Sequence, residues 1–539
     1  MLAERTRALR AALALTIGLA AAIAGVSGSV QHAAAVGDTT TTLVVIVPIS
    51  TPESDEAFIS ADALAQYTSS QGLLTRQLDA VMGLTVAIAI DPRIIVSIRV
   101  LGSAAPVDAT AWLARLASAS NETFALTYGD SDITLATQAG SARVLAPESF
   151  DFAIDESLFV VAPDQTPAPT PPAAPEVPTS ESLEAWDYSI DGLAWPRAGT
   201  VIESDVQAIA DSGYRSVLLS SGNLDGASAA LTRAGGMTAV VSDDDVSVAV
   251  RTAVASRTVD GWQSAMATVT SLLTPGTTVV TLDRSIPLTG TQRAETLLAL
   301  AANPAITLGR LGDLLRATAS AATSIIDQPQ DAAALDRVRL VLEAERSEER
   351  FASIAREPSD VTSPRRLRLL ALLSIAWADN PTGWSAATQQ FLADSIDLRG
   401  TVQVVSSSSF LLLADSSGMP ISVSNALDQA VTVFITVRPE TALLAVGDSR
   451  VELVVEPHSQ AKGVIPVQAI SNGTVQVLVT LSGATGVQIG HPATAEINVQ
   501  AGWETPIVLA IGALVVAVFA GGIVRNIVRR RRRVRQEQP

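Results

Sequence analysis

The stretch TLVVIVPI, residues 42–49, decides the fold of the first part of this chain. It is a continuous run of predominantly apolar, β-branched residues that ends at Ser50-Thr51-Pro52. Such a run is typical of a strand that is buried on both faces of a parallel sheet. Six later segments repeat the pattern and also end at turn-forming residues. They are residues 85–90, 124–128, 192–195, 216–219, 238–241 and 277–282.

Helix-like segments lie between these strands, because their apolar residues recur at spacings of three and four. Examples are residues 73–82, 109–119, 204–212 and 261–273. The alternation of strand and helix predicts a parallel sheet, either open or closed into a barrel. Seven strands favour an incomplete seven-stranded β/α barrel over a doubly wound sheet, and we assign residues 36–286 to it.

Polar and aromatic residues follow directly after several predicted strands, which is where β/α barrels place their functional sites. We therefore predict a ligand-binding rim at this end of the barrel. Aspartates in the same positions also cap helices and form turns, and capping is the competing interpretation for each of them. The candidate rim residues are Asp91, Tyr128, Asp130, Asp132, Trp195, Asp243, Asp283 and Arg284.

The histidine content limits the chemistry of this barrel. The three histidines, His32, His458 and His491, all lie outside the predicted barrel, so neither a histidine zinc site nor a Ser-His-Asp triad can form there. The chain has no cysteine, which excludes a thiolate metal site. We predict no catalytic residues, no metal ligands and no cofactor. The alternative is a metal-independent glycoside hydrolase that uses two rim carboxylates.

A proline-rich segment interrupts the predicted barrel. Residues 163–178 contain seven prolines and cannot form a helix or a central strand. Because too few strands precede it for a separate parallel sheet, we place an insertion at residues 163–180 within the barrel. The pattern of residues 287–399 is helical, and we expect this part to pack on the barrel. The helices predicted there are residues 332–354, 366–377 and 385–398.

From residue 400 onward apolar and polar residues alternate, which is typical of strands with one buried face. Seven or eight short strands within about 100 residues predict an immunoglobulin-like β-sandwich at residues 400–501. The pair Asn472-Gly473 predicts a hairpin turn inside it. The predicted strands are residues 401–405, 410–413, 421–423, 431–437, 451–455, 463–469, 474–481 and 495–499.

The C-terminal end predicts a membrane anchor. Residues 506–524 carry no charge, and at about 1.5 Å per residue they nearly span a hydrocarbon core of roughly 30 Å. We assign residues 502–524 to a transmembrane helix and residues 525–539 to an arginine-rich cytoplasmic tail that attracts anionic lipid. The predicted membrane-interface residues are Trp503, Arg525, Arg529, Arg530 and Arg531.

The N-terminal end predicts secretion. Residues 1–35 combine a basic start, an apolar core and the small residues Ala33-Ala34-Ala35, as a signal peptide does. An uncleaved signal anchor is the alternative. Both interpretations place the bulk of the chain outside the cytoplasm. With residues 1–35 as a signal peptide, we predict a single-pass protein of the cell membrane with a cytoplasmic C-terminal tail.

The charge and composition limit the classes of partner that the chain can bind and indicate the type of genome that encodes it. The formal net charge is −18 although the tail is basic, so the remainder is strongly acidic and would repel nucleic acid. The chain has a single lysine, Lys462, among 36 basic residues. This preference for arginine, together with abundant alanine, indicates a GC-rich genome such as that of an actinobacterium.

Five short motifs resemble those of an uncharacterised actinobacterial cell-envelope family. They are LVVIVPIS, AIAIDP, FALTYGDSD, GLAWPRAG and PISVSNALDQAVTV. The resemblance implies a degenerate barrel related to polysaccharide deacetylases and glycoside hydrolases, then a helical part, an immunoglobulin-like domain and one membrane span with a basic tail. Genes of that family commonly lie beside the gene of the lipid II flippase, which implies a role in cell-wall assembly.

These observations predict a membrane-anchored, non-catalytic envelope protein that binds glycan or a protein partner during peptidoglycan assembly. The expected partners are the membrane, the lipid II flippase or other wall-synthesis membrane proteins, and envelope glycan, but not nucleic acid. The glycoside hydrolase is one alternative. A surface adhesin or receptor that acts through the β-sandwich is the other.

Overall fold

The computed structural model describes most of the chain outside the N-terminal segment. The described residues are 40–159, 177–226, 229–284, 292–405, 410–412, 416–447, 450–499 and 504–534. The predicted signal segment, nearly all of the proline-rich insertion, Trp503 and the last residues of the tail lie outside them. The chain divides into two units, Met1–Thr39 and Thr40–Pro539, and only the second is described.

A curled, half-barrel sheet of parallel strands forms the first part of the described chain. All seven predicted strands are present, and neighbouring strands follow the order β3-β2-β1-β8-β7-β5-β4. Among the described residues no ladder joins β3 to β4, so the sheet is open between them. These strands are β1 (Thr41–Ile49), β2 (Ala87–Ile90), β3 (Glu122–Ala125), β4 (Leu193–Ala194), β5 (Ser216–Ser220), β7 (Met237–Ser242) and β8 (Gly276–Thr281).

Two further strands of this sheet were not predicted from the sequence. Strand β6 (Leu231–Ala234) pairs antiparallel with β7 through a turn at Gly235 and Gly236, both of which have positive φ. Strand β9 (Ile306–Leu308) pairs parallel with the first residues of β1. Strand β1 therefore has β8 on one side and β9 followed by β2 on the other. This central position explains why TLVVIVPI is apolar without interruption.

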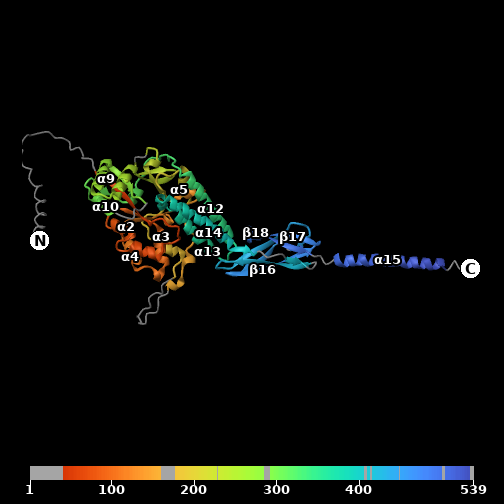
Figure 1. Ribbon diagram of the computed structural model, residues 1–539. Coiled ribbons are helices and arrows are strands. Elements are labelled where there is room, and N and C mark those ends of the chain that lie inside the picture. Colours follow the sequence, from red (N-terminus) through yellow and green to blue (C-terminus); the bar gives the residue numbers. More distant parts are fainter. Residues whose placement is uncertain are drawn as a thin grey trace, which may run out of the picture. The chain divides into compact units, whose positions relative to one another are not determined.

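Alternate residues of β1 belong to two different cores. Leu43, Val45 and Val47 face a cluster that includes the surrounding helices. Val44 and Ile46 face a cluster formed by the other strands, which fills the inside of the curled sheet. The alternation follows from the period of two in a strand. The helices that pack outside (Figure 1) include α2 (Leu73–Val81), α3 (Pro92–Val100), α4 (Val107–Ala117), α8 (Asp244–Ala255), α9 (Val259–Leu272) and α10 (Arg293–Ala302).

The short helix α11 (Leu311–Arg316) follows the sheet, and three longer helices come after it: α12 (Ala332–Ala352), α13 (Ser359–Leu372) and α14 (Pro381–Gly400). Helix α13 begins before the predicted residue 366 and ends before 377, and a short 3-10 helix, Ile375–Asp379, replaces its predicted last turn. The first turn of α13 packs inside the protein through Val361, which is only 8% exposed, and this burial accounts for the early start of the helix.

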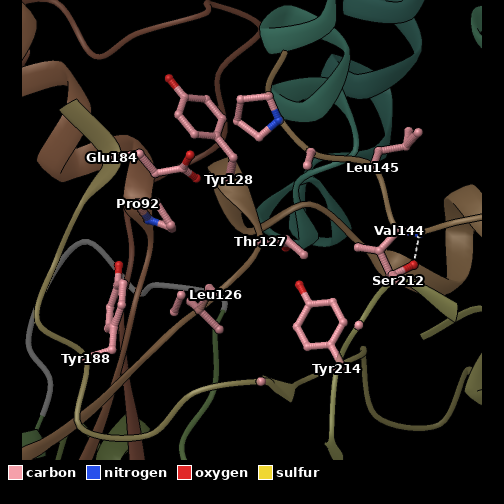
Figure 2. Close-up of a pocket in the computed structure, with 15 residues that line it drawn as sticks. Pro92, Leu126, Thr127, Tyr128, Val144, Leu145, Glu184, Tyr188, Ser212 and Tyr214 are labelled. Atoms are coloured by element: carbon pink, nitrogen blue, oxygen red, sulfur yellow. Dashed lines mark hydrogen bonds between the residues drawn. The ribbon is translucent and has the colours of Figure 1, made fainter. Parts of the chain in front are cut away.

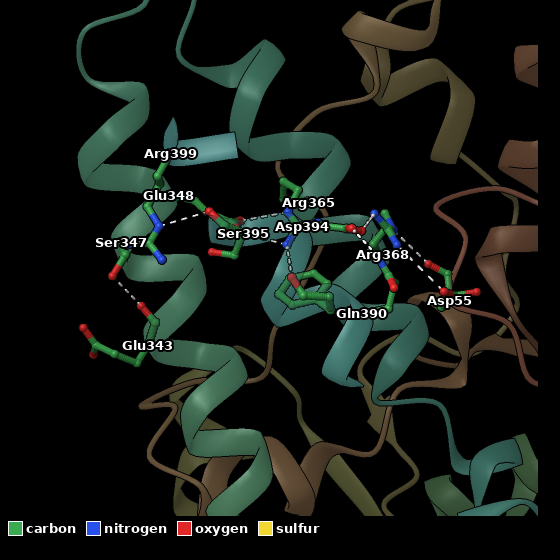
Figure 3. A network of polar contacts seen from close by, with 11 residues as sticks. Asp55, Glu343, Ser347, Glu348, Arg365, Arg368, Gln390, Asp394, Ser395 and Arg399 are labelled. Atoms are coloured by element: carbon green, nitrogen blue, oxygen red, sulfur yellow. Dashed lines mark hydrogen bonds and ion pairs between the residues drawn. The ribbon is translucent and has the colours of Figure 1, made fainter. Parts of the chain in front are cut away.

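Ion pairs join these helices to one another and to the loop after β1 (Figure 3). Arg365 on α13 donates to Glu348 on α12 at 2.8 Å, and both side chains are buried. Arg368 donates to Asp394 on α14 at 2.8 Å and lies 3.8 Å from Asp55 in the first loop. The helical part is therefore bound to the parallel-sheet part by charge as well as by apolar contact.

Two antiparallel sheets enclose one apolar core in residues 402–499. The connection between α12 and α13 also enters this core, through Phe351 and Ile354. The first sheet contains β10 (Val402–Val404), β12 (Ser416–Asn425), β16 (Ser459–Ala469) and β14 (Leu444–Val446). The second contains β11 (Phe410–Leu412), β18 (Gln488–Val499), β17 (Gly473–Ser482), β13 (Val431–Pro439) and β15 (Val451–Val455), with β11 joined in parallel.

All eight strands predicted for this β region are present, but one strand was missed and one predicted turn is wrong. Strand β14 was missed because it has only three residues. Asn472-Gly473 does not form a hairpin, because β16 and β17 belong to different sheets and the turn leads from one to the other. The immunoglobulin-like character of the domain stays a prediction.

The described chain ends in helix α15 (Glu504–Val534). Its segment Val508–Arg532 is long and apolar enough to cross a membrane, and none of it is buried in the protein. A helix of 31 residues is about 46 Å long at 1.5 Å per residue, which exceeds the hydrocarbon core. The helix thus fits a single-pass anchor, and Arg525, Arg529, Arg530 and Arg531 lie in its last turns.

Candidate functional site

Three predicted rim residues meet at the carboxyl ends of their strands. Arg284, after β8, donates from Nη1 to Oδ1 of Asp130 at 2.8 Å and from Nη2 to the carbonyl oxygen of Pro196 at 2.9 Å. Its guanidinium carbon lies 4.5 Å from the ring centroid of Trp195. All three side chains are buried. In this structure Arg284 therefore binds groups of its own chain.

Asp130 is held in an unusual environment. Its φ is 49°, a left-handed conformation that few residues other than glycine adopt. Its second oxygen, Oδ2, is buried and has no partner among the described residues. Burial raises the pKa of Asp130 to about 6, although the charge and hydrogen bond of Arg284 lower it. A proton on Oδ2 would neutralise the carboxylate and so remove part of the free-energy cost of burying its charge.

Asp91 links the end of β2 to the end of β3. Its Oδ1 accepts hydrogen bonds from the backbone N–H of Arg93 at 2.9 Å, as the N-cap of α3, and from that of Gly129 at 2.8 Å. Burial raises the pKa of Asp91 to about 7; the positive charge of Arg93 opposes this shift and the negative charge of Asp130 adds to it. Asp91 therefore caps helix α3 and also fixes the position of the backbone at Gly129.

Two more predicted aspartates cap helices. Asp132 caps α5 (Ile133–Gln138) by accepting from the N–H of Thr134 at 3.0 Å, and its Oδ2 accepts from Gln330 Nε2 at 2.7 Å. Asp243 caps α8 by accepting from the N–H of Val246 at 3.0 Å. Helix capping, the competing interpretation made from the sequence, therefore applies to Asp91, Asp132 and Asp243.

The remaining predicted rim residues lie in different surroundings. Asp283 is exposed and its charge acts on the buried Arg293. Tyr128 is buried and donates from its hydroxyl to the carbonyl oxygen of Ala57 at 2.8 Å. Among the described residues no group of three or more His, Asp or Glu side chains is placed to hold a metal ion.

A pocket of about 300 Å³ lies between the segment after β3 and the segment before β4, where the sheet is open (Figure 2). Three of the four tyrosines of the chain line it: Tyr128, Tyr188 and Tyr214. Only Tyr128 was among the residues predicted from the sequence. The low tyrosine content of the chain was the one available signal, and nothing in the sequence indicated that these three residues converge. The described lining residues are Pro92, Ala125, Leu126, Thr127, Tyr128, Val144, Leu145, Ala146, Pro147, Glu184, Tyr188, Gly192, Ser212, Gly213 and Tyr214.

Glu184 is the one charged residue among the described residues that line this tyrosine pocket. Glu184 as a whole is exposed, yet burial raises the pKa of its carboxyl group, because the end of the side chain turns toward Tyr128 and Pro92 (Figure 2). The pKa of each of the three tyrosines is raised, first by burial. The negative charge of Asp91 adds to the shift for Tyr128 and Tyr188, and the smaller effect of the Glu184 charge adds to it for all three. The carboxylate therefore acts on all three rings.

The phenol groups of the pocket can act as hydrogen-bond donors. With raised pKa values, the phenols stay protonated at neutral pH and can donate hydrogen bonds. The Tyr188 hydroxyl oxygen is buried and has no partner among the described residues, so its hydrogen-bonding capacity is unused. A nucleophile paired with a base is not present among the described lining residues.

The fold and the pocket define a class of protein: an α/β half barrel with a helical part, a β-rich domain and one candidate membrane helix. The chain belongs to the family of unknown function DUF6049, whose family model matches residues 29–539. A search of curated proteins gives no match to this sequence.

Solved structures resemble parts of the chain at low similarity. A native alpha-2-macroglobulin fragment from Escherichia coli is 20% identical with a TM-score of 0.16, and the match covers 19% of this chain and 16% of that one. The alpha-amylase AmyC from Thermotoga maritima is 8% identical with a TM-score of 0.40, covering 67% and 93%. WR4, an MSP family member of C. elegans, is 11% identical with a TM-score of 0.15, covering 19% and 98%. These scores are too low to indicate a shared function.

Proposed function

We propose that this protein is a membrane-anchored, extracytoplasmic envelope protein that binds glycan through the tyrosine pocket and catalyses no reaction. One observation carries the proposal: three of the chain's four tyrosines and one carboxyl group face a single cavity at the opening of the sheet. Asp91, Asp130 and Asp132, by contrast, bond within the protein.

The chemistry of the pocket supports a sugar as the ligand. A sugar ring has C–H faces that pack on aromatic rings and hydroxyl groups that exchange hydrogen bonds with polar side chains. The tyrosine pocket offers both, with apolar walls at Leu126, Val144 and Leu145. Polyanionic polymers are disfavoured, because the chain is strongly acidic outside its tail.

The candidate membrane anchor supports an extracytoplasmic location for the binding part. Helix α15 can hold the binding part at the outer membrane surface, with the arginines on the cytoplasmic side. In this proposal the protein acts in peptidoglycan assembly in an actinobacterium, beside the lipid II flippase or another wall-synthesis membrane protein, and the β-rich domain is an immunoglobulin-like spacer.

Binding by the full chain in detergent micelles tests the proposal. The probes are soluble peptidoglycan fragments and oligomers of glucosamine and N-acetylglucosamine, titrated by calorimetry. We expect Tyr214→Ala to weaken binding about tenfold, because it removes a ring from the pocket wall. Tyr67→Ala, at the fourth tyrosine, is the control and should bind normally. Absence of binding by every probe, or equal loss in both variants, contradicts the proposal, as does turnover of a bound glycan.

A second candidate function is the carboxylate-dependent glycoside hydrolase. It is favoured by the raised pKa values of Asp91 and Asp130, about 7 and about 6, which suit a proton-donating acid. Release of reducing ends from cell-wall glycan, abolished in Asp91→Asn or Asp130→Asn while folding persists, would establish it. Unchanged glycan after prolonged incubation with the wild-type chain would exclude it.

A further inference from the structure

We propose that the tyrosine pocket recognises a positively charged ammonium group, so that the glycan it binds carries a free amino sugar. The inference rests on the proposed function, since it assigns a ligand class to the same pocket. Its basis is that one carboxylate and three tyrosines line the same cavity, with no basic residue among the described residues that line it.

Four separate elements bring these groups together. Tyr128 comes from the 3-10 turn Tyr128–Asp130 after β3, and Glu184 ends helix α6 (Ser180–Glu184). Tyr188 lies in the segment before β4, and Tyr214 lies between α7 (Glu203–Asp211) and β5. Figure 2 shows the Glu184 carboxyl group on the Tyr128 side of the cavity and Tyr214 at the other end. The cavity volume of about 300 Å³ lies in the range of small-molecule pockets and leaves room for a sugar unit.

The residues described as lining the pocket include no basic side chain that could neutralise the Glu184 carboxylate. Two arginines lie near the tyrosines, and both bind backbone carbonyl groups. Arg93 donates to the carbonyl oxygen of Glu56 at 2.7 Å, and Arg99 donates to those of Ser182 and Leu183 at 3.1 and 3.0 Å. A desolvated carboxylate is stabilised by a cation that enters its site. A bound ammonium group would supply that cation.

The tyrosine rings add a second attraction for the same group. The faces of aromatic rings are electron-rich and attract ammonium ions at short range. A neutral N-acetyl group has no net charge to pair with the partly buried carboxylate of Glu184. We expect the amino sugar to bind about tenfold more tightly than its N-acetylated form.

Paired oligosaccharides test this preference on the full chain in detergent micelles, at about pH 6.5, where most amino groups carry a proton. The probes are the glucosamine tetramer and the N-acetylglucosamine tetramer, titrated by calorimetry. Glu184→Gln should reduce the preference to about one, because glutamine keeps the size and loses the charge. The matched control is Glu181→Gln, an exposed glutamate of the same helix outside the pocket lining, which should keep the full preference.

Each outcome decides the matter. A preference for the glucosamine tetramer that disappears in Glu184→Gln and persists in Glu181→Gln supports the proposal. Equal affinity for both tetramers overturns it and leaves the proposed glycan binding intact. A preference that is the same in both variants also overturns it, because the attraction then comes from the general acidity of the chain. Absence of binding by both tetramers and by peptidoglycan fragments overturns the proposed function as well.

Discussion

Arg284 and Asp130 form a buried ion pair with an Nη1 to Oδ1 distance of 2.8 Å, across 154 positions of sequence. The pair joins the residues after β8 to those after β3, on the two sides of the central strands. Charged groups this deeply buried are stable only together, because each would otherwise lack solvation. The pair therefore links the segment after β8 to the segment after β3, and β3 borders the opening of the sheet.

Removing the arginine should destabilise the protein strongly. We expect Arg284→Ala to lower the free energy of unfolding by about 3–5 kcal/mol, because Asp130 is left buried without its cation. Urea unfolding followed by tryptophan fluorescence measures this. Arg316→Ala is the matched control: its ion pair with Asp313 is largely exposed, and the loss should be under about 1 kcal/mol. Similar losses in the two variants would show that the buried pair has no special role.

Asp91 should make stability depend on pH. Its pKa is about 7 in the folded chain and about 3.9 in an unfolded one, so the folded protein holds the proton more tightly. The stabilisation is fully present below about pH 4 and is lost as the pH rises through about 7. Asp130, with a pKa of about 6, acts in the same direction.

The variant Asp91→Asn isolates this effect, because asparagine keeps the oxygen that accepts from Arg93 and Gly129 but does not ionise. Relative to this variant, the wild-type chain should lose more than about 1 kcal/mol of stability between about pH 5 and pH 8. Urea unfolding at the two pH values measures it. The exposed Asp397→Asn should behave like the wild type. Parallel pH profiles of wild type and Asp91→Asn would refute a protonated Asp91.

Two tyrosine hydroxyls in the pocket should respond differently to removal. Tyr128→Phe should cost about 1 kcal/mol of stability, because the hydroxyl donates to the carbonyl of Ala57. Tyr188→Phe should cost nothing or stabilise slightly, because its buried hydroxyl has no partner among the described residues. Urea unfolding compares them. We further expect Tyr188→Phe to weaken glycan binding, which calorimetry detects; equal stability losses in the two variants would contradict the prediction.

A charge in the middle of α15 should disturb membrane insertion. Leu514→Arg places a cation in the apolar segment at a cost of about 2.5–3.5 kcal/mol. Less of this variant should resist alkaline extraction from membranes than of the wild type. Asn526→Arg lies beside the arginines at the end of the span and is the control, with normal retention expected. Full retention of Leu514→Arg would argue against a membrane span.

Local patterns determined several features from the sequence alone. The run TLVVIVPI indicated a central buried strand, and β1 is flanked by strands on both sides. The period of two after residue 400 indicated antiparallel strands, and the charge-free segment before Arg525 indicated the apolar helix. These features were predictable because burial on one face, on two faces or in a membrane limits which type of residue each position can carry.

Only the tertiary structure decided which residues meet. Strand β9 has three residues, too few to show a period, and it pairs with the first residues of β1, with which β2 makes no pairs. Tyr128, Tyr188 and Tyr214 come from separate segments, and the opening between β3 and β4 brings them to the same pocket as Glu184. Likewise, the sequence placed Arg284 and Asp130 after strands but did not indicate that they pair. The physical reason is that contacts between distant residues depend on strand order and register, which the alternation of apolar and polar residues along a chain does not specify.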